Sequence, residues 1–150
     1  MEEKKNSTFA EFSSTVVKAN MAFKCFMRSK FKEHGIDLSF EMLQVLLCLW
    51  EKEGVKQQEI ANIVLKDKAS LTLLIDNLTR RKLVMRTEDV NDRRNKLVTL
   101  TEEGMQLKCQ IMPWIHEMYS IAGKGISQDL LKEGILLFEK ICGNLKTTVV

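Results

Sequence analysis

Hydrophobic residues recur along most of this chain at the three- and four-residue spacing of amphipathic helices. The first stripe predicts a helix over residues 8–32 that ends near His34-Gly35, with apolar positions Phe9, Phe12, Val16, Phe23, Phe26, Met27 and Phe31. Ser39 is a favourable N-cap for a second helix, which should stop around Gly54. Because this second helix is apolar on more than one face, we expect it to be buried on more than one side.

Two shorter helical segments follow with a brief turn between them. Residues 57–65 turn three apolar positions inward, namely Ile60, Ala61 and Val64. Asp67 or Lys68 opens the next helix, whose stripe has the spacing of an amphipathic helix: Leu71, Leu74, Ile75 and Leu78. Two short helices in this order predict a helix-turn-helix unit.

A hairpin is predicted directly after this unit. Residues 83–88 and 96–101 alternate in polarity and contain Val and Thr, which favours two antiparallel strands. The connection at residues 89–95 is charged and rich in turn-forming residues. A hairpin in this position is a wing of the kind that lies against DNA, so the sequence predicts a winged helix-turn-helix.

Two more helices complete the predicted fold. Thr101 caps a helix that runs to about Ala122 and should be kinked by the interior Pro113. After a break at residues 123–125, Ser127 caps a last helix that runs to near Lys146. The fold class is therefore mainly α (α+β), and all 150 residues are expected to form a single domain.

Composition agrees with a soluble globular protein, with 45% hydrophobic and 29% charged residues. The longest strongly apolar stretch, residues 45–50, is too short to span a bilayer, and the N-terminus lacks the apolar core of a secretory signal. We therefore expect a cytoplasmic protein without a membrane partner. Residues 66–100 carry nine Lys or Arg against five Asp or Glu, so the positive charge gathers where DNA phosphates would lie. A solvated basic face would explain the same count.

The four cysteines are widely separated and lack the spacing of a zinc site or a disulfide framework. We expect reduced and mostly packed thiols, with Cys48 in the core. Cys25 is the candidate redox residue, because the cationic neighbours Lys24 and Arg28 can lower a thiol pKa. No metal site, cofactor or enzyme activity is predicted, since no nucleophile motif or Gly-rich phosphate loop is present.

The residues resemble the MarR family of winged helix-turn-helix transcriptional regulators over essentially the whole chain. The resemblance rests on residues 67–84, then Asp92-Arg93-Arg94, then residues 100–104 (Leu-Thr-Glu-Glu-Gly). It implies a homodimer that binds double-stranded DNA at a palindromic operator. Residues 8–35 and 102–150 would then be dimerisation helices, and residues 36–101 the DNA-binding region.

The resemblance also implies roles in the wing. Arg94 would enter the minor groove, Asp92 would hold its guanidinium, and Arg93 and Lys96 would contact the DNA backbone. Asp92 and Arg94 would otherwise only shape a turn.

In the recognition helix, the candidate residues are those of the N-terminal half that the core does not claim: Lys68, Ser70, Thr72, Leu73, Asp76 and Asn77. The alternative for these residues is simple solvent exposure, and for Ser70 helix capping. Arg80 and Arg81 are better placed for phosphates than for bases. Leu73 and Asn77 stand where relatives often carry basic residues, and Lys82 and Leu65 stand where relatives commonly have glycine.

Relatives often bind small aromatic anions between the dimerisation helices and the winged region. Residues that would line such an effector pocket here are Phe23, Met27, Met42, Trp50, Trp114, His116 and Tyr119. The alternative is an ordinary packed core.

The predicted function is a dimeric, sequence-specific repressor that a small-molecule effector releases from DNA. Two alternatives remain. One is a winged-helix module that binds a protein or a small molecule without binding DNA, and the other is a regulator that responds to thiol oxidation.

Overall fold

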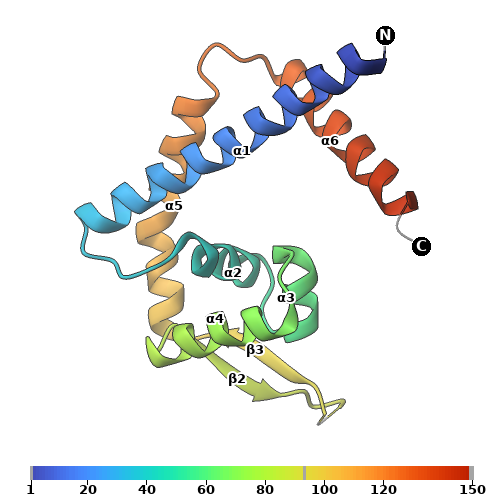
Figure 1. The fold of residues 1–150 in the computed structure, drawn as a ribbon. Coiled ribbons are helices and arrows are strands. Elements are labelled where there is room, and N and C mark those ends of the chain that lie inside the picture. Colours follow the sequence, from blue (N-terminus) through green and yellow to red (C-terminus); the bar gives the residue numbers. More distant parts are fainter. Residues whose placement is uncertain (1, 93, 149–150) are drawn as a thin grey trace. The chain divides into compact units, whose positions relative to one another are not determined.

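The structure of the chain is a computed structural model that describes residues 2–92 and 94–148, with side chains for residues 4–92 and 94–146. The chain forms two compact units, Met1–Ile115 and His116–Val150. The elements in chain order are α1 (Glu2–Glu33), α2 (Phe40–Glu51), β1 (Val55–Lys56), α3 (Gln57–Val64), α4 (Lys68–Arg80), β2 (Val84–Glu88), β3 (Lys96–Leu100), α5 (Glu102–Ala122) and α6 (Gln128–Thr148). Figure 1 labels the six helices and the strands β2 and β3.

The predicted helices and hairpin strands are confirmed to within a few residues, with one larger difference. α1 begins at Glu2, whereas the apolar stripe predicted a start at residue 8. The stripe marks where a helix has something to bury, but the polar residues before it contain no Pro or Gly, so the helix continues through them.

The first unit contains a three-stranded sheet in the order β1-β3-β2. β2 and β3 pair antiparallel from Val84 opposite Leu100 to Glu88 opposite Lys96, which is the predicted hairpin. The short strand β1 pairs with β3 on its other side, with Val55 opposite Val98. Sequence analysis missed β1, because two residues show no alternation.

The core of this unit lies where α2, α3 and α4 pack together with the sheet (Figure 1). α4 contributes the predicted stripe, with Leu71, Ile75 and Leu78 fully buried, while Leu74 is half-buried. Other fully buried side chains come from α2, α3 and the strands: Leu43, Val45, Leu46, Ile60, Val84 and Val98. Because this face of α4 is anchored, the opposite face is held toward solvent.

The second unit contains the end of α5 and the whole of α6. Ser127 caps α6 as predicted, since its Oγ accepts the N–H of Leu130 at 3.2 Å. Most of the apolar stripe of α6 is exposed in the single chain, with exposed fractions of 58% at Leu130 and 59% at Ile135. Among the described residues, no helix is both long and apolar enough to cross a membrane.

Two turns that border α4 have left-handed backbone at non-glycine residues. Leu65 ends α3 with a φ of 53°, and Lys82 follows α4 with a φ of 57°. These are the two positions where the family resemblance leads one to expect glycine. The turns keep their geometry with larger residues, at a cost of about 1–2 kcal/mol for a side chain in this region of backbone space.

Leu65→Gly is expected to raise the free energy of unfolding by up to about 1 kcal/mol, because the glycine removes the strain while little burial is lost. The Leu65 side chain is 87% exposed. Urea unfolding measures the effect. The matched control Leu65→Ala keeps the strain and should change stability by only a few tenths of a kcal/mol, about a tenth of the contribution of a buried Leu. Equal stability of the two variants would contradict the strain assignment.

Gly104, in the first turn of α5, lies against the backbone at the start of the hairpin. A Cβ at this position would lie 2.1 Å from the carbonyl oxygen of Leu83. The same oxygen accepts the N–H of Thr101 at 3.1 Å, and the carbonyl of Gly104 accepts the indole N–H of Trp50 at 3.0 Å. Only glycine permits this approach between α5 and the hairpin.

Gly104→Ala should therefore destabilise the fold by about 3 kcal/mol, because backbone atoms must move to admit the methyl group. Thermal and urea unfolding measure this loss. Glu103→Ala in the same helical turn is the control and should cost less than about 1 kcal/mol, the usual contribution of an acidic side chain near a helix N-terminus. Similar losses for the two variants would contradict the close-approach account.

Candidate nucleic-acid interface

Asp67 fixes the start of α4, the predicted recognition helix. Its Oδ1 accepts the N–H of Ser70 at 2.9 Å, and its Oδ2 accepts the hydroxyl of Ser70 at 2.6 Å. These bonds hold the pKa of the Asp67 carboxyl below its ordinary value, and the bond from the Ser70 hydroxyl is the larger cause. Asp67 is therefore the N-cap of α4, and Ser70 takes part in the cap as the donor to the Asp67 carboxylate.

Most polar side chains on the outer face of α4 bind one another or the helix backbone. The Thr72 hydroxyl donates to the carbonyl of Lys68 at 2.8 Å and accepts the amide of Gln57 at 2.8 Å. The Asn77 amide donates to the carbonyl of Leu73, and its Oδ1 accepts from Arg80 at 2.8 Å. These contacts hold the side chains in fixed positions on the surface.

Exposed positions on the same face differ in character. Leu73 is 65% exposed, and Lys68 and Arg80 are also exposed. Asp76 forms an ion pair with Arg86 of β2 at 2.7 Å, which links the helix to the hairpin. The face therefore offers both an apolar contact and cationic contacts to a ligand.

Arg81 is bonded within the chain, and its predicted contact with phosphate stays a prediction. Its Nη2 donates to Oδ2 of Asp37 at 2.6 Å, and its Nε donates to the carbonyl of the same residue at 3.0 Å. Nη1 also donates to the carbonyl of Asn77. Arg81 thus joins the end of α4 to the segment between α1 and α2, a contact 44 residues distant in sequence that no local pattern reveals.

In the wing, Asp92 organises the turn through the backbone. Its Oδ1 accepts the backbone N–H of Arg94 at 3.0 Å, and its Oδ2 accepts the side-chain amide of Asn95 at 3.0 Å. Asp92 thus supports the backbone of Arg94, and its predicted support of the Arg94 guanidinium stays a prediction. Arg93 lies outside the described residues.

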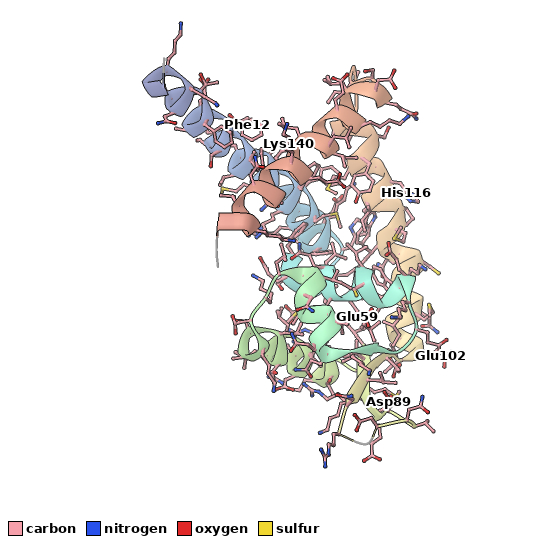
Figure 2. The ribbon with its side chains drawn as sticks, turned by 90° about the vertical axis from the view of Figure 1, so that its right-hand side faces the viewer. Phe12, Glu59, Asp89, Glu102, His116 and Lys140 are labelled. Atoms are coloured by element: carbon pink, nitrogen blue, oxygen red, sulfur yellow. The ribbon has the colours of Figure 1, made fainter. Side chains whose placement is uncertain are left out.

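The cations Arg94 and Lys96 are both exposed at the wing. Asp89, labelled in Figure 2 toward the free end of the hairpin, lies 3.8 Å from the Nζ of Lys56. This contact places Lys56 of β1 beside the wing. Sequence analysis missed Lys56, since its position depends on the pairing of β1 with β3.

Comparison with known proteins gives two decisive findings. The sequence model of the MarR family matches residues 38–96. The HTH-type transcriptional regulator YkoM of Bacillus subtilis, which is uncharacterised, is 31% identical over 73% of this chain and 70% of its own length. The chain belongs to the MarR family. A second relative, the HTH-type transcriptional regulator TtmR of Methylorubrum extorquens, is 31% identical over 75% of this chain, but the chain spans only 57% of TtmR.

Solved structures of the same architecture agree. CouR from Rhodococcus jostii RHA1, bound to p-coumaroyl-CoA, is 27% identical and has a TM-score of 0.74 over 83% of this chain and 87% of its own. Reduced AbfR bound to DNA is 21% identical and has a TM-score of 0.76 over the full length of both chains. At 21% identity, the likeness to AbfR shows only that the two proteins share a fold.

The residues predicted to line the effector pocket are divided between the two units. Met27, Met42 and Trp50 are buried in the core of the first unit, and Phe23 is 36% exposed. The Trp114 ring contacts the His34 ring at a tilt of 36°, with centroids 4.3 Å apart, and makes an edge contact with the Phe31 ring. His116 and Tyr119 belong to the second unit, so a pocket that includes them stays a prediction.

The expectation of mostly packed thiols is wrong for the single chain. Cys48 is buried, and burial raises its pKa. Cys25, Cys109 and Cys142 are exposed, because each lies on a helix face that the chain leaves uncovered. A redox role for Cys25 stays a prediction. In the described part of the chain, His, Cys, Asp and Glu residues form no group of three or more that would hold a metal ion.

The capping bond of α4 gives a titration test. Ser70→Ala should raise the pKa of Asp67 toward its ordinary value, as measured by carbon NMR of the carboxyl group, because the hydroxyl bond is the largest cause of the lowering. Thr72→Ala is the control, since its hydroxyl binds elsewhere. An unchanged pKa in Ser70→Ala would contradict the assignment.

The same shift has a consequence for stability. Because folding lowers the pKa of Asp67, the charged carboxylate stabilises the fold at neutral pH, and this contribution is lost as the pH falls through the folded-state pKa.

Proposed function

We propose that this protein is a dimeric, sequence-specific DNA-binding transcriptional regulator, a repressor that a small-molecule effector releases. The observation that carries the proposal is the pairing of two exposed elements on one rigid unit. The outer face of α4 and the basic end of the β2–β3 hairpin both extend from the core that α2, α3 and the sheet form.

The geometry fits duplex DNA. A recognition helix enters the major groove with its N-terminal residues near base edges, and phosphate contacts position it. Lys68 and Leu73 are exposed on that part of α4, and an exposed leucine suits a thymine methyl group. Arg94 at the wing suits the negative potential of a narrow minor groove.

Dimerisation is proposed from the uncovered apolar surface of the terminal helices. On α1, Val17 and Met21 are each 57% exposed, and on α6 the stripe that includes Leu131 is exposed as well. Apolar stripes of this extent mark protein interfaces. A two-fold dimer would present two α4 helices to half-sites roughly 34 to 36 Å apart.

Release by an effector is proposed by analogy with the family. The CouR structure holds p-coumaroyl-CoA. In this chain, a ligand that changes the spacing of the two α4 helices would release DNA without contacting the bases.

A module that binds a protein through the same face is the competing candidate, and the exposed Leu73 favours it. A salt titration separates the two, since phosphate contacts make affinity fall steeply with salt concentration.

Arg94→Ala is the direct test of the proposal. Affinity for a palindromic duplex, selected from random DNA and measured by fluorescence anisotropy, should fall at least about tenfold, since one good groove contact contributes about 1–3 kcal/mol. Dimerisation, measured by analytical ultracentrifugation, should be unchanged. Arg28→Ala on α1 removes an equal charge far from the wing and serves as the control. Equal affinity of Arg94→Ala and the native protein would contradict the role of the wing.

Asp37→Asn tests whether Arg81 positions α4 or contacts phosphate. If Arg81 positions the helix, losing its partner should weaken DNA binding about two- to fivefold, the size of an exposed ion pair, although a negative charge has been removed. The salt dependence of binding should not change. The control Glu33→Gln removes a similar exposed acid. Tighter binding by Asp37→Asn alone would show that Arg81 is a phosphate contact that Asp37 restrains.

A further inference from the structure

A pocket of about 480 Å³ lies between the helix-turn-helix and the wing. We call it the wing pocket. It is lined by residues from the β1–α3 junction, the start of α4 and the end of the hairpin: Lys56, Gln57, Gln58, Ala61, Lys68, Leu71, Arg94, Asn95 and Lys96. Its volume is within the range of small-molecule sites.

The lining is strongly basic. Four of the nine residues are cations, and none is acidic. Two carboxylates contact lining residues from outside the pocket. Asp92 accepts the backbone N–H of Arg94 and the side-chain amide of Asn95, both at 3.0 Å, and Oδ2 of Asp89 lies 3.8 Å from the Nζ of Lys56, too far for a strong hydrogen bond. The apolar lining is limited to Ala61 and Leu71, both buried in the floor. Such a pocket suits a compact anion better than an aromatic ligand.

Hydrogen-bond donors accompany the charges. Three side-chain amides line the pocket, from Gln57, Gln58 and Asn95. Each amide nitrogen donates one hydrogen bond to a neighbouring side chain, and its second N–H is the donor that an anion could use. α3 begins at this wall, and its N-cap residue Lys56 makes no side-chain capping bond, whereas α4 is capped by Asp67. A tetrahedral anion accepts several N–H donors at once.

The position of the pocket defines the anion further. A helix in the major groove and a wing in the adjacent minor groove lie on either side of one sugar-phosphate backbone. The wing pocket lies between these two elements, so that backbone would pass over it.

We propose that the wing pocket is a phosphate-binding site, which the DNA backbone fills in the complex and which free phosphate compounds fill in the free protein. Lys56, Gln57 and Gln58 thereby join the DNA-binding surface. The inference rests on the proposed function only where it states that the DNA backbone fills the pocket. It adds a second way of releasing DNA, direct competition by a small anion, which needs no change in the spacing of the two recognition helices.

Two measurements test the proposal, with inorganic pyrophosphate as the probe. In the first, amide NMR follows the free protein as pyrophosphate replaces chloride at constant ionic strength. Amide shifts should concentrate at residues 56–58, 68 and 94–96. The double variant Lys56→Gln, Lys68→Gln should weaken binding at least about tenfold, since each charged hydrogen bond contributes about 1.5–3 kcal/mol. Lys32→Gln, an exposed lysine on α1, should bind like the native protein.

In the second measurement, fluorescence anisotropy gives the affinity of the protein for the palindromic duplex selected from random DNA. Lys56→Gln should weaken DNA binding about tenfold. It should also make the fall of log affinity with log salt concentration less steep, by about one unit of slope. Pyrophosphate should displace DNA more effectively than chloride of equal ionic strength.

The two arms fail separately. Pyrophosphate shifts at the pocket with no DNA binding would support the pocket and contradict the proposed function. DNA binding without pyrophosphate-specific shifts, or with equal shifts in the double variant, would overturn the pocket while leaving the function in place.

Discussion

The contact between the backbone of Leu83 and the first turn of α5 is the constraint on which the rest of the structure depends. The carbonyl oxygen of Leu83 accepts the N–H of Thr101. The same oxygen lies so close to Gly104 that any residue with a Cβ at this position would clash with it. Around it, the hydroxyl of Thr101 donates to the carbonyl of Lys82 at 2.5 Å, and Lys108 donates to the carbonyl of Trp50 at 3.1 Å. The end of α2, the turn after α4, the hairpin and α5 therefore meet within a few residues. The first turn of α5 is therefore bonded both to the hairpin and to the turn that ends α4.

The charges of the proposed DNA-binding surface divide into two groups. Arg81 and Arg86 are paired within the chain, with Asp37 and Asp76, and hold the recognition helix to its neighbours. Lys68, Arg94, Lys96 and Lys56 lie at the opening between α4 and the wing. The family resemblance indicated a recognition helix less basic than usual. Because Arg81 is paired with Asp37, the recognition helix has still less free positive charge. The wing and the wing pocket therefore carry a larger share of the proposed phosphate contacts.

Sequence patterns predicted the elements that bury an apolar stripe, and they predicted caps whose chemistry is local. The stripe of α4, the caps Ser39, Asp67 and Ser127, and the paired strands of the hairpin belong to this class. Features created by distant residues were not predictable. β1 exists only because β3 is there to pair with it, and the bond between Arg81 and Asp37 joins residues 44 positions apart in the sequence. In the wing, the sequence pointed to Asp92 but did not reveal that its carboxylate binds the Arg94 backbone.

The central claim is that α4 and the wing together form a DNA-binding face on one rigid unit. The most direct measurement is amide hydrogen exchange of the full chain with and without a palindromic duplex selected from random DNA. The account predicts slower exchange in peptides that cover residues 56–58, 67–77 and 91–96, and little change along α1. Protection confined to the terminal helices, or protection of α4 without the wing, would contradict it.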